Sequence, residues 1–310
     1  MSGDSLSVAQ DACLVELDRL FARIYACDDS QRRVVSDSFC RAAKQVLAQY
    51  AGLDFPFERI RNLSYFKAAD GRFRILNWGI PDQADGTVSY KALLQVRNDE
   101  TQGHILYDMS DMSLYQPYPE QTVCTPETWW GAYYYACIEK QDKGTTYYTF
   151  LGWNAGQGLY QQSVIEVMTI TPDGQVRFGA PVFSNHGRVP GLDGSGLSIP
   201  DEDRQRVVFR FGKRTGMILR YDYQTYFVKT GRKKAVQKKD NMIIFDKLMP
   251  QQMAMADDYA YYIPQGGVYQ AYVWLDGCWD LQLDVQARNP EKPRANRKRE
   301  NPPPLFVPSL

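Results

Sequence analysis

The sequence has little of what metal sites and most catalytic sites are built from. Among its 310 residues only two are histidine, His104 and His186, and they lie far apart along the chain. No Cys-x-x-Cys or His-Glu-x-x-His spacing occurs, so a zinc site would need ligands from distant elements. We therefore expect neither a metal nor a cofactor.

An excess of charge of one sign and a long hydrophobic run are also missing. The 36 basic residues equal the 36 acidic ones, which excludes an overall polycation made to coat nucleic acid. The longest nearly apolar stretch, residues 129–138, is about half the length that crosses a bilayer. We expect no transmembrane helix and no sequence-specific nucleic-acid binding.

Catalytic motifs are missing as well. Gly194-Ser195-Gly196 lacks the Gly-x-Ser-x-Gly frame of a nucleophile elbow, and Gly156-Gln157-Gly158 lacks the third glycine of a dinucleotide-binding turn. His186 precedes a glycine, and a local hydrogen bond in a loop is the simplest role for it. No catalytic residue is predicted, and a non-enzymatic protein is favoured.

The pattern of apolar residues divides the chain into three zones. Residues 1–52 are predicted to form a helical hairpin, because apolar residues recur there at spacings of three and four. From residue 53 to 286 the period changes to two, and Val207, Phe209 and Phe211 alternate with Arg206 and Arg210. This alternation is typical of antiparallel strands with one face in water.

The fold class we expect is mainly β (α+β), a large antiparallel meander with barrel-like or propeller-like closure and an N-terminal two-helix hairpin. Asp-Gly pairs at several expected hairpin turns support the antiparallel assignment. Nothing between the strands resembles a crossover helix, so a parallel sheet is not expected. Ten to thirteen strands are predicted, at residues 73–79, 88–96, 104–109, 132–139, 145–152, 162–170, 175–182, 206–211, 217–223, 242–247, 258–262, 268–275 and 279–285.

The third zone, residues 287–310, is basic and rich in proline and lacks apolar periodicity. We expect a disordered or extended tail. Proline-rich segments bind partner grooves in extended form, so residues 302–308 are a candidate for binding a protein partner.

Six cysteines are present, an even number. In an antiparallel helical hairpin, Cys13 and Cys40 are too far apart for a disulfide, and Cys27 lies near the turn. These three are expected to be small core residues. Cys124, Cys137 and Cys278 would pair only if the sheet brought them together, which leaves the redox compartment open.

Three sets of residues are candidate sites. The first is a glycine- and proline-rich loop, 185–203, whose carboxylates suit a divalent cation or acid–base hydrolysis. Acidic residues before a strand are also commonly just solvated, so both interpretations stay open. The candidates in this loop are Asp193, Asp201, Glu202 and Asp203.

The second candidate is a basic hairpin tip, residues 229–239, with six positive charges and no negative one. It suits an anionic polymer or acidic head groups, in a salt-dependent way. The alternative is a solubilising loop that protects a sheet edge. The binding candidates are Arg232, Lys233, Lys234, Lys238 and Lys239.

The third candidate is a run of aromatic residues that includes Trp129, Trp130 and Tyr134. Exposed rings stack on the sugars of a glycan or anchor a protein partner. Consecutive aromatic residues on a strand point to opposite faces, so a core on both faces of the sheet is the alternative explanation.

Five segments stand out in order along the chain, residues 70–78, 147–153, 178–183, 219–222 and 243–248. Together they resemble a family of uncharacterised proteins from Bacteroidetes-type bacteria. The likeness spans roughly residues 10–290, and no catalytic residue is implied by it. Its members usually begin with a secretory signal, which implies the periplasm or cell envelope. This chain begins Met-Ser-Gly-Asp-Ser-Leu without such a signal, so a trimmed form or a cytoplasmic location are the two alternatives.

Together these observations favour a non-enzymatic binding or assembly module of the bacterial cell envelope. The first alternative is a carboxylate-dependent hydrolase that acts on a polysaccharide. The second is a salt-dependent polyanion binder that works through the basic hairpin.

Overall fold

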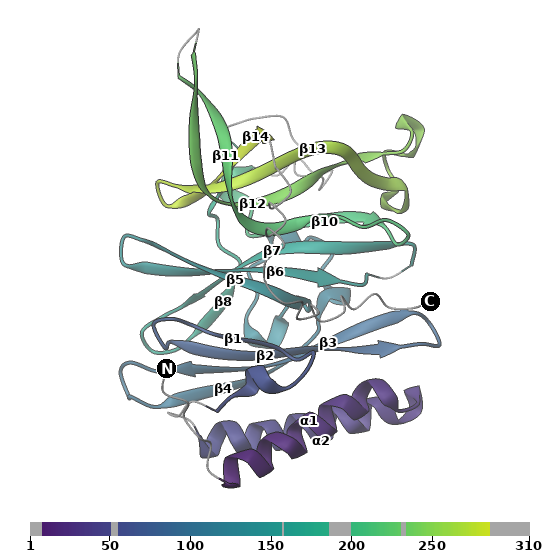
Figure 1. Ribbon diagram of the computed structural model, residues 1–310, viewed down its shortest axis with the longest axis vertical. Coiled ribbons are helices and arrows are strands. Elements are labelled where there is room, and N and C mark those ends of the chain that lie inside the picture. The colour runs from purple at the N-terminus through teal and green to yellow at the C-terminus, as the bar shows by residue number, and fades with distance from the viewer. Residues whose placement is uncertain (1–7, 51–54, 157, 186–199, 231–233, 286–310) are drawn as a thin grey trace, which may run out of the picture.

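The computed structural model describes residues 8–50, 55–156, 158–185, 200–230 and 234–285. Its elements form four stacked layers, a pair of helices followed by three β-sheets (Figure 1). The chain passes through the layers mostly in order, from the helices to the last sheet. Each interface between layers has its own group of buried apolar residues.

The helical layer consists of α1 (Val8–Ala26) and α2 (Asp29–Gln49), which confirms the predicted hairpin. Both helices pack on the outer face of the first sheet. Phe39 lies edge-on to Trp78 with ring centroids 5.1 Å apart, and the Trp78 indole donates a 2.9 Å hydrogen bond to Ser36 Oγ. Cys40 is buried, and Cys13 and Cys27 are partly buried against this core. All six cysteines are free, and the three helical cysteines lie in or against this core, as predicted.

The first sheet has the antiparallel order β1-β2-β3-β4. Both of its faces are covered, because the helices pack on one and the second sheet on the other. In β2, Leu76 and Trp78 face the helices while Phe73 and Ile75 face the second sheet. The strands are β1 (Ser64–Lys67), β2 (Phe73–Asp82), β3 (Thr87–Arg97) and β4 (His104–Ser110).

The second sheet has the order β10-β7-β6-β5, and β8 pairs with β7 beside β10. All of its pairings are antiparallel. It lies between the first and third sheets and contributes to the core on both faces. The strands are β5 (Tyr133–Asp142), β6 (Thr145–Asn154), β7 (Tyr160–Ile170), β8 (Val176–Phe178) and β10 (Val207–Gly212).

The third sheet has the order β11-β12-β13-β14-β9, in which only the short β9 is parallel to its neighbour. Phe209 of the second sheet meets Phe245 of the third with ring centroids 4.8 Å apart. The β11–β12 hairpin extends beyond the stack as a two-stranded ribbon (Figure 1). The strands are β9 (Phe183–Ser184), β11 (Leu219–Thr230), β12 (Lys234–Pro250), β13 (Tyr262–Leu275) and β14 (Cys278–Val285).

The mainly β class with an N-terminal helical pair is therefore confirmed. Within the described ranges, the strands form three open sheets, with no closed barrel and no propeller. The segment 258–262 is largely a 3₁₀ turn, η7 (Tyr259–Tyr261), rather than a strand, and β1 was not predicted. None of the helices in the described ranges is long and apolar enough to cross a membrane. The tail 287–310 lies outside the described residues.

Candidate interaction surface on the crossover segment

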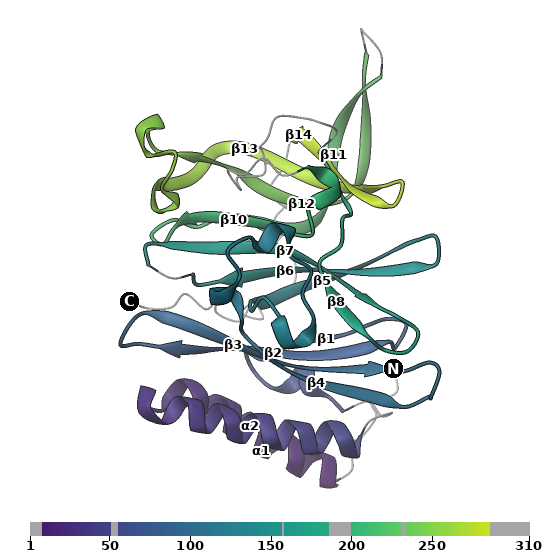
Figure 2. The same cartoon turned by 180° about the vertical axis from the view of Figure 1, so that it is seen from behind.

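The chain passes from the first sheet to the second through residues 111–132, which we call the crossover segment. It lies along one side of the stack and carries three short 3₁₀ turns (Figure 2). Proline begins two of the turns, where its fixed φ suits a turn and its missing N–H leaves no donor unpaired. The turns are η2 (Ser113–Tyr115), η3 (Pro119–Gln121) and η4 (Pro126–Thr128).

Hydrogen bonds join the two ends of the crossover segment. The Met112 amide donates to the Trp129 carbonyl at 3.0 Å. The Asp111 carboxylate accepts from the Ser113 amide at 2.8 Å and from the Gly131 amide at 3.1 Å. Burial raises the pKa of Asp111, and these hydrogen bonds oppose that effect. The segment is therefore a closed loop whose base is fixed.

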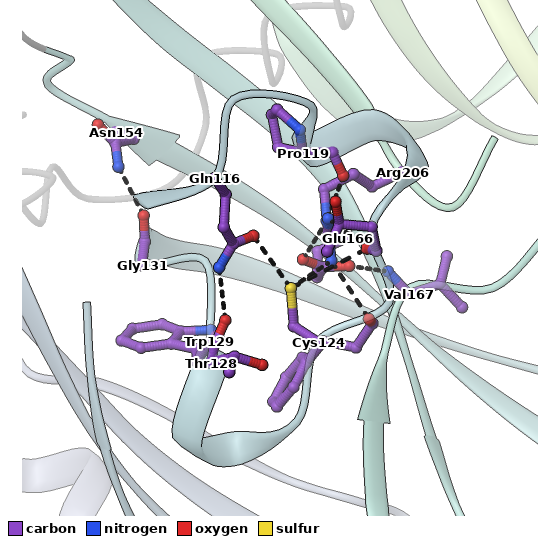
Figure 3. Close-up of polar contacts among 12 residues, drawn as sticks. Gln116, Pro119, Cys124, Thr128, Trp129, Gly131, Asn154, Glu166, Val167 and Arg206 are labelled. Atoms are coloured by element: carbon purple, nitrogen blue, oxygen red, sulfur yellow. Dashed lines mark hydrogen bonds and ion pairs between the residues drawn. The ribbon is translucent and has the colours of Figure 1, made fainter. Parts of the chain in front are cut away.

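The buried side chain of Arg206 binds the backbone in the middle of the crossover segment (Figure 3). Its guanidinium donates to the carbonyls of Pro119 and of Thr122, the latter at 2.8 Å. It also donates to the Phe178 carbonyl at 3.2 Å, and its Nε donates to Glu166 Oε2 at 2.7 Å. The Arg206 and Glu166 side chains are both fully buried. One side chain thus links β10, β7 and the crossover segment.

Cys124 lies in the same cluster. Its Sγ is 3.3 Å from Arg206 Nη2 and 3.1 Å from Gln116 Oε1 (Figure 3). Its backbone pairs with Phe178 in both directions, at 2.7 and 2.8 Å. Burial raises the pKa of the Cys124 thiol, although Arg206 opposes this shift. The thiol stays protonated near neutral pH and buried, so it has the environment of a structural cysteine and not of a nucleophile.

A second buried ion pair joins the crossover segment to β10. Arg210 Nη1 donates to the carboxylate of Glu120, which is fully buried. The Arg210 guanidinium also lies over the Tyr259 ring, 5.4 Å from its centroid. The Glu120 carbonyl accepts from the Gln205 amide at 2.7 Å. Alternation along 206–211 predicts that Arg206 and Arg210 face water; this is wrong, because the crossover segment covers that face and supplies their partners.

The crossover segment also carries exposed apolar side chains, in contrast to the buried groups described above. Four of these are large, and we call them the crossover patch. Pro117 beside them is also exposed. The backbone that carries them is held by the hydrogen bonds described above, so this apolar surface is fixed in shape. The patch consists of Leu114 (62% exposed), Tyr115 (74%), Tyr118 (64%) and Val123 (47%).

The predicted aromatic candidates lie in or beside this segment but point inward. Trp129, Trp130 and Tyr134 are almost completely buried. The Trp129 indole donates to the Tyr134 hydroxyl at 2.9 Å, and the Tyr134 ring stacks on Phe150 with centroids 4.7 Å apart. These rings fill the core between the first two sheets and do not form a surface for ligands. The aromatic density therefore reflects core packing on both faces of the sheet, and the exposed residues of the crossover patch gave no periodic signal in the sequence.

The acidic candidates that the structure describes do not form a metal site. Asp193 lies outside the described residues. Asp201, Glu202 and Asp203 form the 3₁₀ turn η5. Asp201 accepts a 2.8 Å hydrogen bond from the Asn185 amide, while Glu202 and Asp203 are exposed. Across the described ranges, no group of three His, Cys, Asp or Glu side chains is arranged to hold a metal ion.

The basic candidates belong to the projecting ribbon. Arg232 and Lys233 lie outside the described residues, and Lys234 is the first residue of β12. Lys238 and Lys239 are exposed on β12, opposite Tyr226 and Thr225 of β11. The ribbon therefore carries exposed positive charge at Lys238 and Lys239.

Comparison with known proteins identifies no relative. No protein-family model matches this chain, and neither does any curated protein or solved structure.

Proposed function

We propose that this protein is a non-enzymatic binding or assembly module, and that the crossover patch is its surface for a protein partner. The observation that carries the proposal is the contrast between the fixed backbone of the crossover segment and the exposed apolar side chains that it carries. Its backbone is fixed by Arg206, Glu120 and Asp111, yet Tyr115 and Tyr118 remain mostly exposed. Four exposed large apolar side chains within residues 114–123 are more than the single scattered ones that are normal on a protein surface, and such concentrations are characteristic of binding sites.

A fixed backbone makes such a surface effective. A partner that binds loses less conformational entropy when the residues it meets are already ordered. Tyrosine is enriched among the residues that contribute most to protein interfaces, because its ring is large and rigid and its hydroxyl is polar. Leu114 and Val123 add aliphatic surface to the two tyrosines, and this mixture favours a protein partner over a stacked sugar ring.

The compartment we propose is the periplasm or cell envelope. It is supported by the ordered resemblance of residues 70–78, 147–153 and the later segments to a family whose members usually carry a secretory signal. Fractionation of the native cells with an antibody against the protein tests it. Recovery with the cytosolic fraction alone would contradict it.

The binding proposal is tested by cross-linked affinity capture from the native cells. The full chain is compared with the double variant Tyr115→Ser/Tyr118→Ser and with Tyr223→Ser. Tyr223 is a matched control because it is an exposed tyrosine (59%) on the third sheet, in β11. A partner that is captured by the wild type and by Tyr223→Ser, and lost from the double variant, is the expected result. Equal capture by all three proteins would contradict the proposal.

A second candidate function is salt-dependent binding of an anionic polymer by the β11–β12 ribbon. It is supported by the exposed Lys238 and Lys239 on an element that extends beyond the stack (Figure 1). Because such contacts release counterions, binding would weaken steeply as salt rises.

A further inference from the structure

The crossover patch lies within a long stretch of sequence that lacks basic residues. From Asn98 to Glu139 the sequence contains no lysine and no arginine. The crossover segment within this range carries Asp111, Glu120 and Glu127, of which Glu127 is exposed. The exposed part of the crossover segment therefore combines tyrosine, proline and negative charge without any positive charge.

Further negative charge lies on η5, close in sequence to a contact with η3. The hydrogen bond from the Gln205 amide to the Glu120 carbonyl places the segment after η5 against η3. Glu202 and Asp203 of η5 are exposed and lie two to three residues before that contact. Exposed carboxylates are thus carried by η5, two to three residues before its contact with η3, as well as by Glu127 in η4.

The last part of the chain has the complementary composition. Residues 288–300 contain six basic residues and two acidic ones. They are followed by the apolar and proline-rich segment Pro302-Pro303-Pro304-Leu305-Phe306-Val307-Pro308. Proline-rich segments bind aromatic surfaces at low entropic cost, and flanking charges of opposite sign orient them.

We infer that the crossover patch is covered by the C-terminal segment of the same chain, with residues 302–308 on Tyr115 and Tyr118 and the basic residues before them beside Glu127, Glu202 and Asp203. The inference rests on the proposed function, because it takes the patch to be a binding surface. The C-terminal segment would then regulate that function, since a protein partner must displace the segment before the partner reaches the patch.

The chain is long enough for this contact. The last described strand, β14, ends at Val285, and residues 286–301 span up to about 50 Å when extended. Packed sheets lie roughly 10 Å apart, and the crossover segment joins the first two sheets while β14 belongs to the third. Tethering also gives the segment an effective concentration on the order of millimolar, which favours the contact within one chain over the same contact between two chains.

Photo-crosslinking of the full chain tests the inference. The photoreactive amino acid p-benzoylphenylalanine replaces Phe306, the dilute protein is irradiated, and the crosslinked peptides of the monomer are identified by mass spectrometry. The expected partner peptide contains residues 112–128. Its yield should fall about tenfold in Tyr115→Ser/Tyr118→Ser and stay unchanged in Tyr223→Ser, because only the first change removes the aromatic anchors.

Three results would overturn the inference. The first is a crosslink pattern that is the same in the patch variant as in the wild type. The second is a crosslink concentrated on another element, such as the exposed β11–β12 ribbon. The third is a crosslink to residues 112–128 found only between two chains, which would assign the contact to a second copy.

Partner capture with the same variants separates this inference from the proposed function. If the patch variant loses the partner but the segment does not crosslink to residues 112–128, the inference fails and the proposed function stands. If the segment crosslinks as expected but capture is unaffected by the variant, the patch binds only the chain's own segment and the proposed function fails.

Discussion

At the scale of single residues, Arg206 is the residue on which the crossover segment depends most. It contacts two carbonyls of that segment, one of β8 and the carboxylate of Glu166, and it is completely buried. A buried charge is tolerated only when its partners are all in place. The cluster therefore stabilises the fold only while all of its members are present.

Replacing Arg206 with Met should lower the free energy of unfolding by about 3–5 kcal/mol, because Glu166 is left buried without its partner. Chemical denaturation of the purified variant measures the change. The double variant Arg206→Met/Glu166→Leu is the control, since it removes both charges and should be more stable than the single variant. A single variant as stable as the wild type would show that the ion pair does not hold this region.

The raised pKa of Asp111 predicts that the stability of the protein depends on pH. Because burial raises its pKa in the folded protein above the ordinary 3.8, the folded state binds more protons than the unfolded state just above that pH. Its contribution to stability is therefore complete below about pH 3.8 and is lost as the pH rises through the higher, folded-state value. Asp111→Asn, which keeps an oxygen acceptor, should remove this fall when unfolding is measured from about pH 4 to pH 7. The same fall in both proteins would contradict the assignment.

The sequence did not predict these residues. Arg206 and Arg210 alternate with apolar residues, a pattern that is normally read as a strand with a wet face. Their burial depends on Glu166 of β7 and on Glu120 of the crossover segment, both remote in sequence. Nothing local to residues 206–211 indicates that an acidic residue will lie opposite each arginine.

At the scale of elements, the crossover segment depends on close packing at its base. A Cβ atom at Gly131 would lie 2.3 Å from the Asp111 Cγ atom, far inside van der Waals contact. The Asp111 carboxylate cannot move away without losing its hydrogen bonds to the Ser113 and Gly131 amides. The glycine is therefore required by the turn that closes the segment.

Gly131→Ala should destabilise the protein by about 1–3 kcal/mol and make the crossover segment more sensitive to limited proteolysis. Gly216→Ala is the matched control, because no heavy atom lies within 4 Å of a Cβ placed there. Thermal unfolding and proteolysis of both variants give the comparison. Equal behaviour of the two would mean that the base of the segment is looser than the geometry indicates.

The β11–β12 ribbon yields a separate prediction. Lys238→Gln/Lys239→Gln should weaken binding of heparin or polyphosphate and make that binding less dependent on salt, since fewer counterions are released. Titrations between about 50 and 300 mM salt measure both effects. If wild-type binding is unchanged over this range, electrostatic capture by the ribbon is excluded.

Most helices and strands were predictable because their periodicity is strong and local. The four-residue β1 was missed since it is too short to show a period. The residues of η7 look like a strand because three of the four residues from Tyr259 to Tyr262 are aromatic. Tyr115 of η2 and Tyr118, the residue before η3, were not singled out, because an irregular segment has no period from which exposure can be read.

At the scale of the whole molecule, the stack accounts for the high aromatic content. Each of the first two sheets is buried on both faces, so consecutive residues of β2 such as Ile75, Leu76, Asn77 and Trp78 are all buried. The choice between a barrel, a propeller and a stack depends on which strands pair at long range. Strand spacing carries no information on that pairing. The sequence therefore could not show that the three sheets stay open.

The central claim is that the crossover patch binds a protein partner, and the most direct test is the dissociation constant of the captured partner. It is measured for the wild type, for Tyr115→Ser/Tyr118→Ser and for Tyr223→Ser. Two central tyrosines are expected to contribute about 2 kcal/mol or more together, which corresponds to a dissociation constant raised roughly 30-fold in the double variant. Tyr223→Ser should bind within about twofold of the wild type. A double variant that folds normally and binds as tightly as the wild type would contradict the claim.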